Sequence, residues 1–182
     1  MHIIDMPTDE VHLQQAAETI MLAFAENWPG AWDTLEEGLE ELREMMVEER
    51  ICLAALIDER VIGWIGGIPE YDGNVWELHP LVVHPDHQGQ GVGRALVQAF
   101  EQRVAEKGAV TIMLGSDDEN LMTSLGGTDL YDNLHHKIAT IRNLKGHPYE
   151  FYQKMGYAIV GVIPDANGPG KPDILMAKRV KH

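Results

Sequence analysis

Cysteine is almost absent from this sequence, since Cys52 is the single cysteine among 182 residues. One thiol cannot build the internal disulfide framework that is typical of oxidising compartments. No run of about 18 apolar residues is present either, which argues against a transmembrane helix. The opening residues, MHIIDMPTDE, lack the basic region and apolar stretch of a secretory signal. We therefore expect a cytoplasmic protein that does not bind a membrane.

Basic residues are also scarce: 14 Lys and Arg stand against 29 Asp and Glu, which gives a formal net charge of −15. Such a surface disfavours nucleic acid, because phosphates require clustered basic side chains. It favours cationic partners by electrostatic steering, although acidity can equally serve solubility alone. The histidines show no HExxH motif and no Cys/His spacing of a zinc site, so we expect no bound metal.

Apolar residues recur with helical and strand periods that predict one α+β domain over residues 1–182, without repeats or a linker. A first helix should start at Thr8, as its cap, and a second should run from Thr34 to about residue 48. The first should bury Val11, Ala16, Ile20, Leu22 and Phe24, and the second should expose Glu36, Glu37, Glu40, Glu41 and Glu44. Further helices are predicted over 91–107 and 148–155, with a short helix or loop inside 129–144. Strands are predicted over 2–6, 51–57, 61–68, 75–83, 110–114, 157–163 and 174–180, the three between 51 and 83 forming an antiparallel meander.

The most informative stretch is residues 83–94, VHPDHQGQGVGR, where a strand ends and a helix begins. Its glycines let the chain turn tightly and let a ligand approach the backbone N–H groups. The first N–H groups of a helix lack internal partners and carry partial positive charge, so this turn suits a pyrophosphate. The spacing matches neither the dinucleotide fingerprint G-x-G-x-x-G nor a P-loop. It does match Q/R-x-x-G-x-G/A through Gln88, Gly91 and Gly93.

This motif, after the strand WELHPLVV at 76–83, resembles motif A of the GCN5-related N-acetyltransferases (GNAT), which holds the coenzyme A pyrophosphate. FYQKMGY at 151–157 resembles the family's motif B, which would place Tyr152 beside the thioester sulfur. The resemblance implies a mixed, mostly antiparallel central sheet flanked by helices, with acetyl-CoA as co-substrate. Lys145 departs from it, because many members carry asparagine there. The coenzyme-binding residues that it implies are Leu81, Val82, Val83, Gln88, Gly89, Gln90, Gly91, Val92, Gly93, Arg94 and Tyr152.

Further segments resemble the aminoglycoside 6'-N-acetyltransferases, resistance enzymes that modify the 6'-amine of kanamycin-type drugs. They are WELHPLVV (76–83), SDDE (116–119), TSLGGTDLYD (123–132), HPYEFYQKMGY (147–157), and PDANG with KPDI inside 164–174. Trp28-Pro29 is a weaker match in the N-terminal part. The fold does not require these blocks, so they are more specific than motif A. The resemblance implies an aminoglycoside as acceptor, antibiotic resistance and a homodimer.

Acetyl transfer to an amine requires loss of an ammonium proton, polarisation of the carbonyl and stabilisation of the leaving thiolate. Glu77 is the candidate base, acting through a water, and its strand parity places it on one face with His79 and Leu81. His79 could relay protons, contact the substrate or be structural. The resemblance assigns the backbone N–H of Leu81 to the acetyl carbonyl, and Tyr152 is the candidate acid. Cys52 lies in an apolar strand, so we expect a structural thiol and direct attack by the amine in a ternary complex.

A substrate with several ammonium groups should meet carboxylates and aromatic faces. Trp28 could stack on a sugar ring, whereas each candidate Asp or Glu side chain can equally be a solvated loop charge. Besides Glu77 and His79, the candidate substrate-binding residues are Trp28, Tyr71, Asp117, Asp118 and Asp129, with Glu119 and Asp132 in the same acidic segments. Two other functions remain open: acetylation of polyamines or protein lysines, and a regulatory coenzyme A-binding domain without turnover. Glu77 together with Tyr152 argues against the second.

Overall fold

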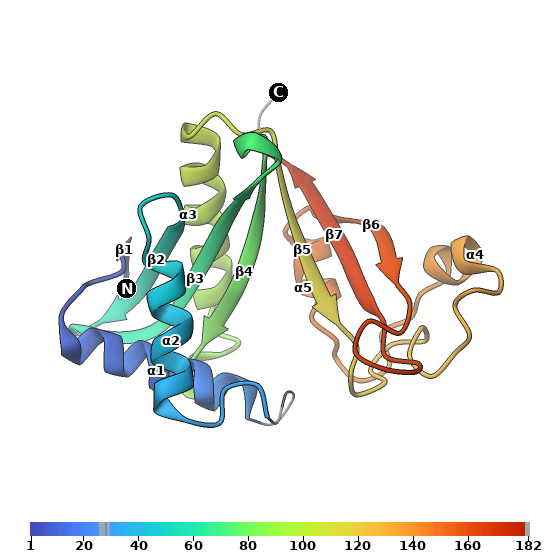
Figure 1. The fold of residues 1–182 in the computed structure, drawn as a ribbon, viewed down its shortest axis with the longest axis horizontal. Coiled ribbons are helices and arrows are strands. Elements are labelled where there is room, and N and C mark those ends of the chain that lie inside the picture. The colour runs from blue at the N-terminus through green and yellow to red at the C-terminus, as the bar shows by residue number, and fades with distance from the viewer. Residues whose placement is uncertain (26–27, 29, 181–182) are drawn as a thin grey trace. The chain divides into compact units, whose positions relative to one another are not determined.

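The computed structural model describes residues 1–25, 28 and 30–180. The chain forms two compact units, one of Met1–Ile112 with the C-terminal end from Val180, and one of Met113–Arg179. Elements of the first unit are β1 (His2–Asp5), α1 (Glu10–Phe24), α2 (Leu35–Met45), β2 (Ile51–Ile57), β3 (Arg60–Glu70), β4 (Val75–Val83) and α3 (Val92–Glu106), with short 3-10 helices at Tyr71–Gly73 and Pro85–His87. Its strands pair in the order β1-β2-β3-β4, all antiparallel (Figure 1).

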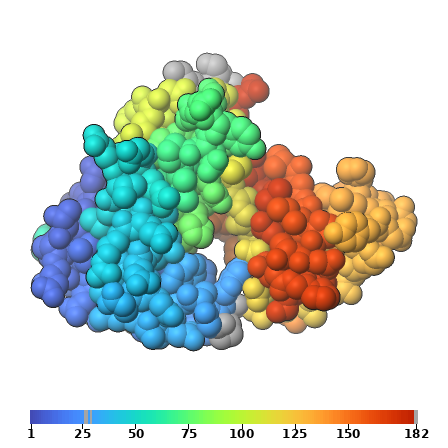
Figure 2. Space-filling view, viewed as in Figure 1, coloured from blue at the N-terminus to red at the C-terminus, as the bar shows by residue number. Residues whose placement is uncertain are grey.

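Helices cover both faces of this sheet. The Trp64 indole of β3 donates a hydrogen bond to the Ala16 carbonyl of α1 at 3.1 Å, whereas a Cβ on the neighbouring Gly63 would meet Leu96 of α3. Because adjacent strand residues project to opposite faces, α1 and α3 lie on opposite sides of β3. Met45 of α2 lies on the same side as α1. In the space-filling view, α1 and α2 form a continuous surface in blue and cyan (Figure 2).

The positions at which α1 and α2 begin correct one prediction and confirm another. The cap of α1 is Asp9, whose carboxylate accepts from the His12 backbone N–H, so the prediction of Thr8 was wrong by one residue. Val11 and Leu22 are 61% and 51% exposed, contrary to expectation, because the face that contacts the sheet runs through Ala16, Ala17 and Ile20. The second helix starts at Thr34 as predicted, where Thr34 is the N-cap in a capping box with Glu37, but it ends at Met45 rather than near residue 48.

An extra residue in β4 changes which face its side chains occupy. The register pairs Leu81 with Ile65 but Leu78 with Gly67, so β4 advances three residues while β3 advances two. Glu77 therefore pairs with Ile68, and its side chain projects to the face opposite that of Leu81. Simple parity put the two side chains on one face, and the bulge makes that prediction wrong.

The second unit contains β5 (Thr111–Asp117), α4 (Leu134–Ala139), α5 (Tyr149–Lys154), β6 (Ala158–Ile163) and β7 (Asp173–Arg179), with strand order β5-β7-β6. The hairpin of β6 and β7 is antiparallel. β5 extends to Asp117, three residues beyond the predicted end at 114, so Asp117 is the last residue of the strand and not part of the following loop. Gly156 follows the C-cap of α5 and adopts a φ of 92°, so the helix ends where the predicted range 148–155 ends.

Candidate active site

The glycine-rich turn is held in shape by its own polar side chains. After β4 the chain makes a 3-10 turn at Pro85–His87, in which the His84 ring accepts from the Asp86 N–H at 3.2 Å. The Gln88 side-chain amide donates to the Val83 carbonyl at 3.1 Å, and that of Gln90 donates to the Asp86 carbonyl at 2.7 Å. These bonds fix the path of the backbone between β4 and α3.

The turn leaves the start of α3 accessible. Gly91 is the N-cap with a φ of 89°, and among the described residues no side chain caps the first turn of the helix. A Cβ built on Gly89 or Gly91 would meet no described atom within 4 Å. The first N–H groups of α3 therefore have no side-chain cap from the described part of the chain, and the exposed Arg94 lies in the same turn. This arrangement fits the pyrophosphate of a coenzyme A molecule.

On β4, the structure places His79 beside Glu41 of α2, and Glu77 two residues before it. The His79 Nε2 atom lies 3.6 Å from the Glu41 carboxylate, and the His79 side chain is 45% exposed. Glu41 raises the pKa of His79, burial opposes this shift, and the charge of Glu77 adds to it. Glu41 was expected to face solvent with its neighbours, yet its side chain is only 15% exposed, so that prediction was wrong. Nothing in the helical pattern distinguishes Glu41 from Glu40, and only the position of α2 over the sheet reveals the pair.

Tyr152 lies in the second unit on α5, where it is 8% exposed. Its ring packs edge-on against Tyr157, with ring centroids 5.7 Å apart. Burial raises the pKa of the Tyr152 phenol well above its usual value, so the hydroxyl keeps its proton at physiological pH. Such a group can donate a proton or a hydrogen bond but is a poor base.

The acidic candidates of the second unit differ sharply in their surroundings. Asp118 is fully buried, and its carboxylate accepts from the N–H of Met122 and from both the N–H and the hydroxyl of Thr123. Its contacts are those of a structural residue that holds the loop after β5. Asp117 is half-buried and bonds the side chain of Asn167. Asp129 is exposed and accepts from the Tyr131 N–H at 2.9 Å.

The remaining candidates occupy varied positions. Tyr71 is 71% exposed in the turn before β4, and Trp28 is half-buried, while its neighbour Pro29 lies outside the described residues. Lys145 is exposed, and its amine donates to the Asn120 carbonyl at 3.3 Å. Cys52 is half-buried on β2, and burial raises the pKa of its thiol to about 12, which disfavours a thiolate nucleophile.

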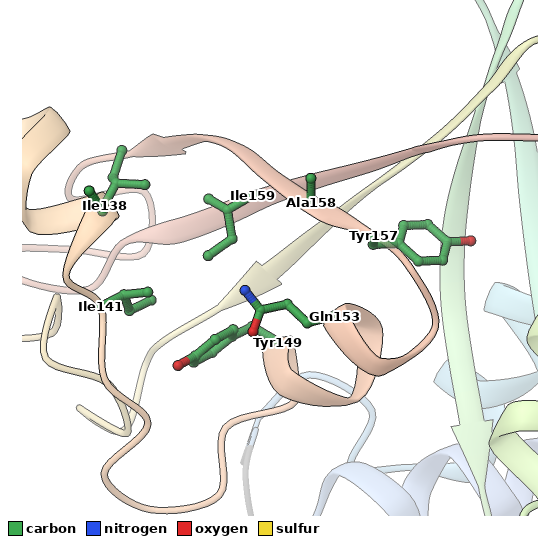
Figure 3. A pocket seen from close by; sticks show the side chains of 8 residues that line it. Ile138, Ile141, Tyr149, Gln153, Tyr157, Ala158 and Ile159 are labelled. Carbon is green, nitrogen blue, oxygen red and sulfur yellow. The ribbon is translucent and has the colours of Figure 1, made fainter.

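A pocket of about 640 Å³ opens in the second unit, and none of the described residues that line it is among the predicted site residues. Ile138 and Ile141 line it from the segment of α4, opposite Ile159 of β6, with Tyr149 and Gln153 of α5 between them (Figure 3). Its described lining residues include no carboxylate, so the pocket does not suit a polycationic ligand. Within residues 1–25, 28 and 30–180, the structure contains no group of three His, Cys, Asp or Glu residues that could hold a metal, and no helix long and apolar enough to cross a membrane.

Comparisons with known proteins agree with this fold. The model of the acetyltransferase (GNAT) family matches residues 14–123. An acetyltransferase of Sodalis glossinidius is 26% identical over 109 residues, which cover 59% of this chain and 70% of that protein. A crystal structure of an aminoglycoside 6'-N-acetyltransferase complexed with coenzyme A is 43% identical, with a TM-score of 0.91 over 99% of this chain and 97% of that one. The aminoglycoside 6'-N-acetyltransferase from Enterococcus faecium is also 43% identical, with a TM-score of 0.89 over the same shares.

The fold and the glycine-rich turn define a transferase of known architecture: this chain belongs to the acetyltransferase (GNAT) family. Within that family, it is similar over nearly its whole length to aminoglycoside 6'-N-acetyltransferases. The predicted α+β fold, with a mostly antiparallel sheet flanked by helices, is confirmed.

Proposed function

We propose that this protein, as one transferase domain spanning residues 1–182, moves the acetyl group of acetyl-CoA onto the 6'-amine of aminoglycosides. The observation that carries the proposal is the 43% identity to an aminoglycoside 6'-N-acetyltransferase across 99% of the chain. The acidic surface, with a net charge of −15, supports a polycationic acceptor. In a cell this activity would confer antibiotic resistance, and we propose that the enzyme works in the cytoplasm as a homodimer.

The glycine-rich turn would hold the coenzyme. N–H groups of the uncapped first turn of α3 would bind the pyrophosphate, and the open space in front of Gly89 and Gly91 would admit it. Arg94 would add a positive charge beside the phosphates. The side chains of Gln88 and Gln90 would act mainly by fixing the turn, because both already bond backbone carbonyls.

The reaction would proceed by direct attack of the amine on the thioester carbonyl, supplied in activated form by acetyl-CoA. Glu77 would accept the ammonium proton through a water, and the Leu81 backbone N–H would donate to the carbonyl oxygen. Tyr152 would donate a proton or hydrogen bond to the departing thiolate, a role that fits a phenol kept protonated by burial. The pKa of about 12 at Cys52 disfavours an acetyl-cysteine intermediate.

Exposed acidic and aromatic side chains would receive the cationic sugar rings. Asp129, Tyr71 and the half-buried Trp28 remain candidates for this contact, as does Asp117 at the end of β5. Asp118 is not retained as a substrate-binding residue, because its carboxylate is buried and already accepts three hydrogen bonds.

The deciding experiment is a thiol-release assay with acetyl-CoA and matched acceptors. Kanamycin-type drugs that carry a 6'-amine should release coenzyme A, whereas analogues with a 6'-hydroxyl should not. Spermidine and a lysine peptide test the two other acceptor classes, and faster turnover of either would overturn the drug assignment. Glu77→Gln and Tyr152→Phe should each lower kcat by about 100-fold. Tyr149→Phe, a buried tyrosine on the same helix, serves as the control for Tyr152.

A further inference from the structure

Glu41 is the exception among the glutamates of α2. Its neighbours on the helix, Glu36, Glu37, Glu40 and Glu44, are exposed, whereas the side chain of Glu41 is 15% exposed. A carboxylate at that depth requires partners, because burial of an unpaired charge is costly. The Glu41 side chain reaches His79 of β4, the strand that holds the candidate base.

Three groups surround the Glu41 carboxylate. The His79 ring lies 3.6 Å away through Nε2, and it is the main cause of a lowered pKa at Glu41. The Trp32 side chain and the more distant positive charge of Arg50 both lower the same pKa further. Arg50 is itself anchored, since its guanidinium donates to the Glu44 carbonyl of α2 at 2.9 Å. Glu41 is therefore held as a carboxylate in a fixed position.

The surroundings of His79 favour its protonated form. Glu41 faces it from α2, Glu77 precedes it by two residues on the same face of β4, and Arg50 opposes them from the segment after α2. Two carboxylates against one guanidinium leave a net attraction for the imidazolium. A protonated imidazole donates from both nitrogens and accepts from neither. An imidazolium at His79 cannot take a proton from an incoming ammonium group, which leaves that role to Glu77.

We propose that Glu41 is a positioning residue for acetyl transfer: its carboxylate orients His79 through Nε2 and favours the imidazolium, so that Glu77 rather than His79 accepts the proton of the amine. The assignment of roles rests on the proposed function, whereas the effect of Glu41 on His79 does not. The ammonium proton passes to Glu77 through water, and the proton on His79 stays in place throughout.

The test uses Glu41→Gln, which keeps the shape of the side chain and removes its charge. Glu40→Gln, one position earlier and exposed, is the matched control. The first measurement is the NMR titration of the His79 ring in the free protein. Its midpoint should move to lower pH in Glu41→Gln and stay unchanged in Glu40→Gln. Glu41→Asp, which keeps the charge on a shorter side chain, should retain part of the wild-type midpoint. An unmoved midpoint in Glu41→Gln overturns the inference.

The second measurement is the pH dependence of kcat with acetyl-CoA and a 6'-amino aminoglycoside. Glu41→Gln should lower kcat on the order of 10-fold near neutral pH, with little change in the KM for acetyl-CoA, and should move the histidine limb of the profile to lower pH. A normal profile beside a moved NMR midpoint would show that the charge of His79 is irrelevant to transfer, which also overturns the inference. If the wild type acetylates no aminoglycoside, the proposed function fails while the NMR titration still tests the pair.

Discussion

Gly67 of β3 lies directly against the ring of Phe100 of α3, and a Cβ on this glycine would overlap two carbons of that ring. Phe100 is fully buried, so the ring cannot swing aside into solvent. A Cβ on Gly63, four residues earlier in β3, would lie 2.7 Å from the Val82 carbonyl oxygen and 3.3 Å from Leu96 of the same helix. The glycines of β3 thus let α3 approach the sheet closely, and this contact sets the position of the helix whose N-terminus is the proposed coenzyme site.

Gly67→Ala should therefore lower the free energy of unfolding by about 1–3 kcal/mol, because overpacking forces the ring or the backbone to shift. Urea unfolding of the purified protein measures this change. Gly161→Ala on β6 is the control, since the nearest atom to its built Cβ is a leucine methyl at 3.8 Å. Equal stability of the Gly67 variant and the wild type would contradict the close packing of α3.

Gly91→Ala should weaken acetyl-CoA binding more than it weakens the fold. Alanine at a φ of 89° costs about 1–2 kcal/mol, and relief of this strain would displace the N–H groups at the start of α3. We expect the KM for acetyl-CoA to rise about 10-fold. Gly108→Ala, at the same φ beyond the other end of the helix, carries similar strain and should leave that KM unchanged. Equal effects of the two variants on KM would argue against the site.

Asp118→Asn should destabilise the second unit without acting on chemistry directly. The side-chain NH2 of the new asparagine would face the backbone N–H of Met122 or Thr123, which now donates to the Asp118 carboxylate. A buried N–H group that loses its acceptor in this way costs about 1–3 kcal/mol. Thermal unfolding should show a lower Tm, whereas Asp129→Asn, which changes an exposed carboxylate, should leave it near the wild-type value. An unchanged Tm together with a large rise in the drug KM would instead return Asp118 to the substrate-binding residues.

Cys52 should behave as an unreactive thiol. Its pKa of about 12 leaves almost no thiolate at neutral pH, and the thiolate is the reactive form. Maleimide labelling followed by mass spectrometry should proceed at least about 10-fold faster in urea than in the native protein. Cys52→Ala should retain acetyl transfer, and loss of transfer in a folded Cys52→Ala protein would reopen the covalent route.

The Glu41–His79 pair should stabilise the protein most at mildly acidic pH. Glu41 has a lowered pKa, so its contribution is present above its ordinary value of 4.5 and is lost as the pH falls through the folded-state pKa. His79 has a raised pKa, so its contribution is complete below 6.5 and is lost as the pH rises through the folded-state value. The stabilising window therefore lies between these values.

Urea unfolding of the wild type and Glu41→Gln at two pH values checks this window. The difference in unfolding free energy should be below about 1 kcal/mol even near pH 5.5, because His79 is 45% exposed, and it should be smaller at pH 8.5. A difference that grows toward pH 8.5 would have the wrong sign for this ion pair.

The sequence by itself determined the order of the elements and the place of the glycine-rich turn. Periodicity predicted β2 and β4 with correct bounds, and the predicted start of the second helix at Thr34 agrees with α2, because local chemistry controls these features. The spacing of Gln88, Gly91 and Gly93 likewise depends only on residues that are neighbours in the chain. Such local signals predict a turn that can admit a ligand without knowledge of how the rest of the chain packs.

Only the tertiary structure decided which side chains meet across elements. The bulge in β4 arises from pairing with β3, and it separates the faces of Glu77 and Leu81 that simple alternation would join. Glu41 has the sequence neighbourhood of a solvent-facing helix residue, and α2 must lie over β4 before it can pair with His79. Asp118 sits in a block of acidic residues that looks exposed, yet the loop folds back and buries it. Each of these outcomes depends on packing between distant segments, which a local sequence pattern does not encode.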